Sequence, residues 1–172
     1  GAKPGDMLIL TRPIGSGVIL AADMLGQAGG RDVAATLLIM GQAQDREAAL
    51  LAPVAHAMTD VTGFGLAGHV HAMCQASKLD ADLFHDAIPT YPGARVLSDL
   101  GVSSTLMPAN YLDAPVAGPH DALLYDPQTA GGLLAAVPEK LSTTVLQALI
   151  AQGCTGHIIG RLRKGTGCLY LS

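Results

Sequence analysis

The 172-residue sequence predicts an α+β fold, a β-sheet with helices packed on it. Short apolar runs of strand length are bounded by glycine and proline, and between them lie longer segments with apolar residues at helical spacing. The two kinds of segment are mixed without strict strand–helix–strand alternation, which favours α+β over a purely parallel α/β sheet. The length suits one domain, residues 1–172, with a proper core.

The first third of the chain predicts one strand followed by helices. Met7–Thr11 is a continuous apolar run after a Pro-Gly-Asp turn, so we expect a buried strand there. Two glycines flank Ser16, a candidate cap for a helix over Val18–Gln27, which Gly29-Gly30 is expected to end. Arg31–Leu51 is rich in Ala, Leu and Met and predicts one or two further helices.

The middle of the chain predicts two short strands around a helix. Val54–Val61 is the first strand, and Gly65–Ser77 has the apolar spacing of a helix. Leu79–Phe84 alternates apolar and acidic residues, which predicts a strand with one solvent-facing side. After a short helix at Ala94–Leu100, we expect Gly101–Gly118 to be a long loop, because proline and glycine interrupt it and no regular pattern follows.

The last third predicts more strands and one long helix. We expect Ala122–Tyr125 and Leu133–Val137 to be strands joined by a glycine-containing turn. A proline then starts a helix over Leu141–Gln152. The apolar runs His157–Leu162 and Cys168–Leu171 flank Lys-Gly-Thr-Gly, which is typical of a β-hairpin.

Composition excludes several classes of protein. Hydrophobic residues make up 49% of the chain and charged residues 14%, which is typical of a globular protein and excludes a disordered one. The net charge of −4, the lack of a basic cluster and the scarcity of aromatic residues argue against nucleic acid or an anionic membrane as partner. No apolar run is long enough to span a bilayer and no signal peptide opens the chain, so we expect a cytoplasmic protein with reduced cysteines.

The stretch Ala57–His69 carries the first chemical signal. It passes from an apolar segment through Asp60 into the glycine turn Thr62-Gly63-Phe64-Gly65 and then into a helix. Amide groups at a helix start suit an anion such as phosphate, and glycines let the backbone approach it closely. Asp60 could hold a cation that the phosphates share, because Mg²⁺ usually takes only one or two carboxylates. An N-capping turn with a surface aspartate explains the pattern equally well.

The second chemical stretch is Asp126-Pro127-Gln128-Thr129-Ala130-Gly131-Gly132. Asp and Thr can cap a turn, Gln can reach a neighbouring segment, and paired glycines permit a backbone approach that a side chain would block. A tight connection between two strands explains the stretch as well. We also expect Gly63 and Gly131 to hold positive-φ conformations that other residues avoid.

Other catalytic signals are weak. His69 and His71 point to different faces of their helix, and neither has a partner at metal-ligand spacing. The chain contains neither a nucleophile elbow nor a phosphate-loop lysine, and no cysteine has an evident activating neighbour. The residues themselves therefore predict no catalytic group in this chain.

Three stretches taken together resemble the C-terminal half of the selenophosphate synthetase (selenide, water dikinase) family in order and spacing. They are Pro4–Gly17, Ala57–His69 and Asp126–Leu134, and the resemblance covers nearly the whole chain. It implies a domain of the type shared with aminoimidazole ribonucleotide synthetase, with α/β/α layers, a mixed sheet and a partly ferredoxin-like arrangement. The chain departs from the family pattern at Arg12, where Lys is frequent, and at Ala130, where Ser is frequent. Arg12 keeps the charge with another donor geometry, and Ala130 lacks the hydroxyl.

The resemblance also implies an activity. The family makes selenophosphate from selenide, ATP and water and releases AMP and phosphate. Asp60 matches the one Mg²⁺ ligand that this half contributes, whereas the catalytic Lys, the catalytic Cys or selenocysteine and the other metal-binding aspartates would belong to an N-terminal half. We therefore expect the isolated chain to be inactive and to work with that half in a homodimer. The residues expected to face phosphate are Thr62, Gly63, Gly65, Thr129, Gly131 and Gly132.

Two other functions fit the sequence. The domain could be a non-catalytic docking face for the rest of a longer polypeptide, which the absence of an initiator Met also predicts. It could instead be the equivalent domain of a related ATP-dependent synthetase with another substrate. A glycine-rich segment upstream of Gly1, with a Cys or selenocysteine near a Lys, would favour the selenium enzyme.

Overall fold

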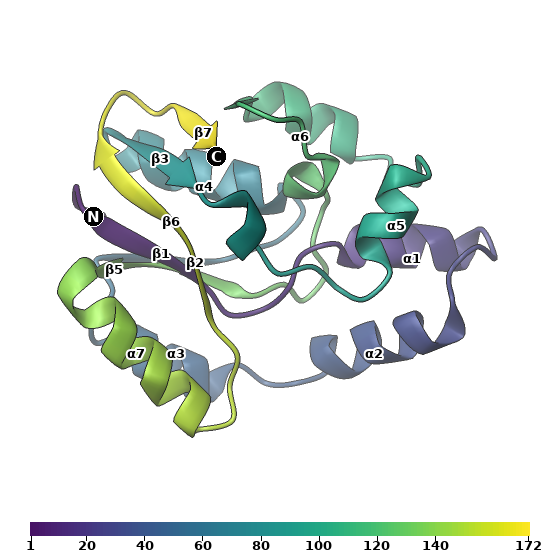
Figure 1. Ribbon diagram of the computed structural model, residues 1–172, viewed down its shortest axis with the longest axis horizontal. Coiled ribbons are helices and arrows are strands. Elements are labelled where there is room, and N and C mark those ends of the chain that lie inside the picture. The colour runs from purple at the N-terminus through teal and green to yellow at the C-terminus, as the bar shows by residue number, and fades with distance from the viewer.

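The computed structural model describes residues 1–172 and contains one mixed sheet of seven strands (Figure 1). The strands lie in the order β2-β5-β1-β6-β3-β7-β4. Neighbours are antiparallel except that β7 is parallel to both β3 and β4. Their bounds are Asp6–Leu10 (β1), Ala57–Asp60 (β2), Leu79–Leu83 (β3), Val116–Ala117 (β4), Leu133–Pro138 (β5), His157–Lys164 (β6) and Leu169–Leu171 (β7).

Helices cover both faces of the sheet, which confirms the layered α/β/α arrangement. Figure 1 shows α3 and α7 below the sheet, and α4 lies on the opposite face with α1, α5 and η2. No helix is both long enough and apolar enough to cross a bilayer. The helices are Ser16–Met24 (α1), Gly30–Met40 (α2), Asp45–Leu51 (α3), Gly65–Ser77 (α4), Ala94–Asp99 (α5), Met107–Asp113 (α6) and Glu139–Ala151 (α7), with 3₁₀ turns at His85–Ala87 (η1) and Ala122–Tyr125 (η2).

The alternation of side chains along the central strands divides the interior into two cores. Leu8 and Leu10 of β1 belong to the larger core of 30 buried residues, whereas Ile9 between them belongs to a smaller core of six. Leu134 and Ala135 of β5 divide in the same way. Successive side chains of a strand point to opposite faces, so these central strands need apolar residues at every position.

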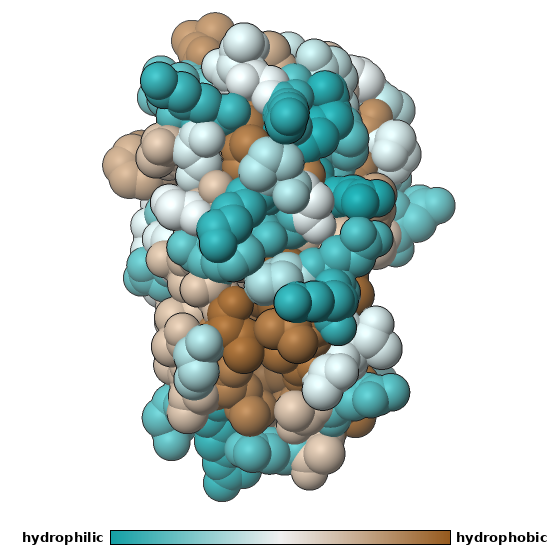
Figure 2. All heavy atoms as spheres, turned by 90° about the vertical axis from the view of Figure 1, so that its left-hand side faces the viewer, coloured by the Kyte–Doolittle hydropathy of each residue, from teal (hydrophilic) through white to brown (hydrophobic).

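The smaller core reaches the molecular surface. Leu50, Val54 and Leu141 are only partly buried where they pack against it. Figure 2 shows the corresponding face, where hydrophobic side chains gather in the lower half, at the level of α3 and α7.

One edge of the sheet brings the ends of three strands together. Both β1 and β2 pair antiparallel with β5, so they run parallel to each other and end at the same edge, where β5 begins. Leu10 lies opposite Leu134, and Asp60 lies opposite Leu133. The segments that follow β1 and β2 and the one that precedes β5 therefore meet.

The predicted hairpin between His157–Leu162 and Cys168–Leu171 is wrong. Both segments are strands, but β3 lies between them, pairing antiparallel with β6 and parallel with β7. The linking turn closes over Asp80 of β3, whose carboxylate accepts the amides of Thr166 at 2.8 Å and Cys168 at 2.9 Å. These hydrogen bonds hold the pKa of Asp80 below its usual value. Asp80 is thus buried, and the expectation of a solvent-facing side for this strand is wrong at that position.

Three further expectations need correction. Ala122–Tyr125 forms η2 instead of a strand, because the Asp121 carboxylate accepts the amide of Leu123 at 3.0 Å and caps a 3₁₀ turn. The expected loop Gly101–Gly118 contains α6 and β4. Helix α1 ends at Met24, before Gly26 at a φ of 68°, so Gly29-Gly30 does not end it; instead Gly29 caps α2 and Gly30 is its first residue.

Candidate functional site

The three motif stretches meet at the sheet edge where β1 and β2 end and β5 begins. The amide of Val61 donates to the carbonyl of Gly132 at 2.8 Å, and the amide of Gln128 donates to the carbonyl of Thr62 at 2.9 Å. The Pro4–Gly17 stretch is joined to the Asp126–Leu134 stretch through Leu133, whose amide donates to the Thr11 hydroxyl at 2.8 Å. Segments that lie up to 122 residues apart in sequence therefore form one continuous backbone surface.

Asp60 is the exposed acid of this surface. It is the last residue of β2, and its carboxylate makes no ion pair or hydrogen bond within the chain. No group of three or more His, Cys, Asp or Glu side chains gathers anywhere with the arrangement of a metal site. A single free carboxylate fits one ligand of a Mg²⁺ ion and does not amount to a complete site.

Gly65, and not Gly63, is the glycine that the first turn requires. Gly65 has a φ of 70°, and a Cβ there would lie 2.8 Å from the carbonyl carbon of Tyr125. Gly63 has no positive φ, and a Cβ there would meet nothing within 4 Å. The expectation of a special conformation at Gly63 is therefore wrong, because the tight approach of the turn to η2 comes two residues later.

His69 of α4 accepts a hydrogen bond from one amide of this turn. The amide of Thr62 donates to Nε2 of His69 at 2.9 Å, and the Thr62 hydroxyl lies 3.1 Å from the same nitrogen. Burial lowers the pKa of His69, and nearby Asp60 partly opposes this effect. A neutral imidazole with its proton on Nδ1 suits this contact, since Nε2 must accept. The amides of Gly63 and Phe64 have no partner within the chain.

The stretch Asp126–Gly132, called the second motif from here on, holds the start of α1. Oε1 of Gln128 accepts the amides of Gly15 at 3.1 Å and Ser16 at 3.2 Å, and the carboxylate of Asp126 accepts the amide of Gly17 at 2.9 Å. Asp126 is fully buried, and burial raises its pKa to about 6. These contacts occupy the amides at the start of α1, so Gln128 and Asp126 serve the packing of the turn on the helix.

The paired glycines of the second motif are buried where the backbones meet. A Cβ on Gly131 would lie 2.2 Å from the carbonyl oxygen of Val61, and one on Gly132 would lie 2.5 Å from the amide nitrogen of Arg12. Gly131 has no positive φ, so its requirement is space and the conformational expectation for it is wrong. Ala130 is the residue in the left-handed region, at a φ of 48°.

The two positions that depart from the family pattern are in contact. Nη1 of Arg12 donates to the carbonyl of Ala130 at 2.8 Å, and Nη2 donates to the carbonyl of Gln42. Arg12 is only 4% exposed. Its guanidinium therefore anchors the Ala130 turn and is not free to bind a ligand.

Of the six residues expected to face phosphate, three reach the surface. Thr129 is exposed, and Thr62 and Gly63 are half-buried, whereas Gly65, Gly131 and Gly132 are buried. The three exposed or half-buried residues remain candidates for direct ligand contact. The buried glycines contribute by allowing the turns to pack.

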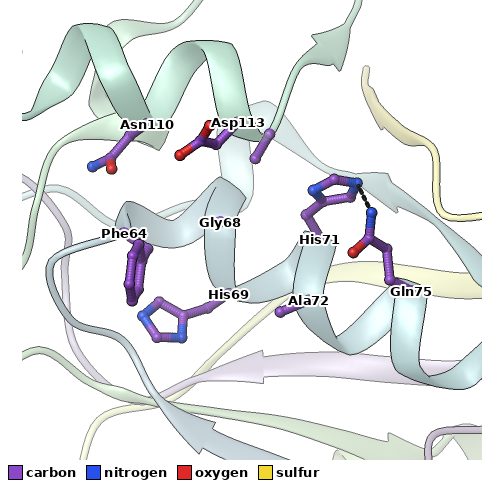
Figure 3. A pocket seen from close by; sticks show the side chains of 9 residues that line it. Phe64, Gly68, His69, His71, Ala72, Gln75, Asn110 and Asp113 are labelled. Atoms are coloured by element: carbon purple, nitrogen blue, oxygen red, sulfur yellow. Dashed lines mark hydrogen bonds between the residues drawn. The ribbon is translucent and has the colours of Figure 1, made fainter.

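Asn110 is a residue of this region that the sequence did not reveal. It lies on α6, where a loop was expected, and its amide nitrogen donates to the carbonyls of Gly63 at 2.8 Å and Tyr125 at 2.9 Å. Figure 3 shows Asn110 and Asp113 projecting from α6 on one side of a cavity, with Phe64, Gly68 and His69 on the other. The cavity has a volume of about 340 Å³.

A second cavity, of about 490 Å³, lies next to the exposed part of the motifs. Gly63, Gln128 and Thr129 are among the residues that line it. The lining also includes apolar side chains, among them Met24, which is 82% exposed, and Leu106. The candidate site therefore opens beside an apolar surface that nothing in this chain covers.

Cys74 takes no part in the site. Cys74 is buried in the larger core, and burial raises the pKa of its thiol to about 12. A thiol with so high a pKa stays protonated at neutral pH and is a poor nucleophile.

Comparison with known proteins gives two kinds of similarity. Residues 3–168 match the family described as AIR synthase related protein, C-terminal domain. The chain is 38% identical over 172 residues to the selenide, water dikinase of Shewanella sp. (strain W3-18-1), with 96% of this chain and 49% of the relative covered. The chain thus spans about half the length of this relative.

Solved structures share the fold at lower identity. The hydrogenase maturation protein HypE of E. coli superposes with a TM-score of 0.65 at 20% identity, covering 98% of this chain and 47% of that one. A HypE in complex with ATP superposes with a TM-score of 0.61 at 19% identity, covering 95% and 44%. These likenesses confirm the fold class.

Proposed function

Because the chain belongs to the AIR synthase related protein family as a C-terminal domain, we propose that it is the C-terminal half of a selenophosphate synthetase. The complete enzyme would convert selenide, ATP and water to selenophosphate, AMP and phosphate. The identity of 38% to a selenide, water dikinase over nearly the whole chain supports this substrate choice. The chain covers only 49% of that relative, which supports a complete protein of two domains.

The observation that carries the proposal is the meeting of all three motifs beside a free carboxylate. Asp60 is exposed and unpaired at the edge where β1 and β2 end. The partnerless amides of Gly63 and Phe64 and the exposed hydroxyl of Thr129 belong to the same surface. Phosphoryl transfer relies mainly on positioning the phosphate and neutralising its charge. The free amides of this surface are suited to positioning a phosphate, and Asp60 is suited to holding a metal ion that neutralises its charge.

Asp60 would hold Mg²⁺ together with carboxylates from the other half. The ion, when bound, would neutralise phosphate charge during transfer. The amides of Gly63 and Phe64 would donate to a phosphate oxygen, and His69 would keep Thr62 in place beside them. Gln128 and Asp126 would keep the second turn fixed on α1. No catalytic nucleophile or lysine is assigned to this chain.

The partner of this surface would be the N-terminal half of the same polypeptide, in a homodimer. Met24 and Leu106 are exposed in the cavity that Gly63 and Thr129 also line. Exposed apolar side chains beside the site support the proposal that another domain covers this surface. A neighbouring half would bury these side chains and place its own acidic and basic groups opposite Asp60.

A related synthetase with another substrate is the second candidate, favoured by the shared fold of HypE. The test is to measure AMP and selenophosphate formation by the full-length protein with ATP and Mg²⁺, with and without selenide. The proposal expects selenide-dependent AMP release from the full-length protein and none from the 172-residue chain. ATP turnover that ignores selenide, or turnover by the isolated chain, would contradict it.

A further inference from the structure

We propose that Asn110 is a positioning residue that holds the Thr62–Gly65 turn in the conformation its free amides need to meet phosphate. The inference rests on the proposed function, and it assigns a role to α6, a helix outside the three motifs. The observation behind it is that one buried side chain bridges the turn and η2, which the second motif follows.

The contacts of Asn110 are specific. Asn110 is 7% exposed, and its Nδ2 lies 2.8 Å from the carbonyl oxygen of Gly63 and 2.9 Å from that of Tyr125. Both amide hydrogens are thereby used. The opposite orientation of the amide would place its oxygen against two carbonyl oxygens, so the chemistry fixes the assignment.

The other backbone anchors of the turn lie on the Thr62 carbonyl, which accepts the amides of Gly65 at 3.1 Å and Gln128 at 2.9 Å, and none of them reaches the Gly63–Phe64 peptide. Gly63 is half-buried and carries no side chain, and a Cβ there would touch nothing within 4 Å. His69 fixes the Thr62 amide at 2.9 Å, and Asn110 fixes the Gly63 carbonyl. A peptide plane held by its carbonyl also has its amide direction set, because the group is planar. Asn110 therefore sets the direction of the Phe64 amide, which shares that peptide plane.

Two substitutions separate this role from simple packing. Asn110→Asp keeps the shape but replaces the donor with an acceptor facing two carbonyls. Asn110→Leu keeps most of the volume and removes the polar group, should the first variant fold poorly. The matched control is Asp113→Asn, since Asp113 is exposed on the same helix and lines the same cavity without a hydrogen bond (Figure 3).

The experiment compares these variants in the full-length protein by steady-state kinetics and by amide hydrogen exchange. We expect Asn110→Asp to raise KM for Mg²⁺–ATP about tenfold or more, with a smaller change in kcat, because losing a buried donor misplaces a binding amide. Exchange at Thr62, Gly65 and Gln128, whose amides are hydrogen-bonded within or to the turn, should accelerate about tenfold or more while amides of the central strands keep their rates. Asp113→Asn should change neither quantity by more than about twofold.

The two readouts keep the inference and the proposed function apart. In an active protein, a KM that stays unchanged, or that rises without faster exchange in the turn, overturns the positioning role even if the melting temperature falls. A full-length protein without selenide-dependent ATP turnover refutes the proposed function. In that case the amide hydrogen exchange rates alone test the positioning role of Asn110. Faster exchange confined to the turn supports this role, and unchanged rates overturn it.

Discussion

Substituting Ala at Gly65 and at Gly63 gives a matched pair only two residues apart. Gly65 has a φ of 70°, and a Cβ there would lie 2.8 Å from the carbonyl carbon and 3.0 Å from the Cα of Tyr125. A left-handed conformation costs a non-glycine residue about 1–2 kcal/mol, and overpacking against a fixed backbone costs about 1–3 kcal/mol more. Gly65→Ala should therefore lower the free energy of unfolding by about 2–5 kcal/mol. Gly63→Ala meets nothing within 4 Å and should change it by less than about 0.5 kcal/mol.

Thermal and urea unfolding of the 172-residue chain measures the difference. At about 2–4 °C per kcal/mol for a chain of this length, a loss of about 3 kcal/mol lowers Tm by about 6–12 °C. Gly63→Ala should leave Tm within about 2 °C of the parent. Equal losses in the two variants, or a larger loss at Gly63, would refute the assignment of the strained position to Gly65.

The remaining predictions concern the second motif. Ala130→Gly should raise the free energy of unfolding by about 0.5–1 kcal/mol, because relief of the φ of 48° exceeds the entropy that glycine adds to the unfolded chain, and a lower urea midpoint would contradict this. Burial raises the folded-state pKa of Asp126 to about 6 from an ordinary value of 3.8. The folded protein then binds more protons than the unfolded one between these values, so stability should fall as pH rises from about 4 to about 6. Asp126→Asn should remove that fall, and an unchanged pH dependence in the variant would point to another group.

The sequence predicted most elements because their signals are local. β1, α4, β5 and α7 each have a continuous apolar or helical pattern with clear turn residues at their ends, and all four form as expected. The resemblance picked out the three motifs, but that they meet is a finding of the structure, made by the hydrogen bonds of Val61 with Gly132, Gln128 with Thr62, and Leu133 with Thr11.

The errors arise where a distant segment decides the local structure. The turn between β6 and β7 has hairpin residues, but β3 occupies the space between the two strands, and no feature of the turn itself encodes that insertion. Asp80 looked like a surface acid because three amides that satisfy it lie 86 to 88 residues away.

The candidate site, too, depends on contacts between segments that are distant in the sequence. Glycine positions signal tight turns, but sequence spacing does not distinguish Gly65, which approaches Tyr125, from Gly63, which approaches nothing. Asn110 carries no motif of its own, and its role depends on where α6 packs. Its one available signal was a polar residue four positions from each of two apolar neighbours, Leu106 and Ala114, in a segment then expected to be a loop.

The most direct test of the account is the Mg²⁺ dependence of the full-length protein carrying Asp60→Asn. The substitution keeps the shape of the exposed, unpaired side chain and removes its charge, so Tm should stay within about 2 °C of the parent. We predict that selenide-dependent AMP release falls at least about 100-fold at saturating ATP, since loss of a metal ligand costs several kcal/mol of transition-state stabilisation. The matched control Asp99→Asn, at another exposed and unpaired acid, should keep normal activity. Near-normal activity and Mg²⁺ dependence in Asp60→Asn would contradict the assignment of this sheet edge as part of the metal site.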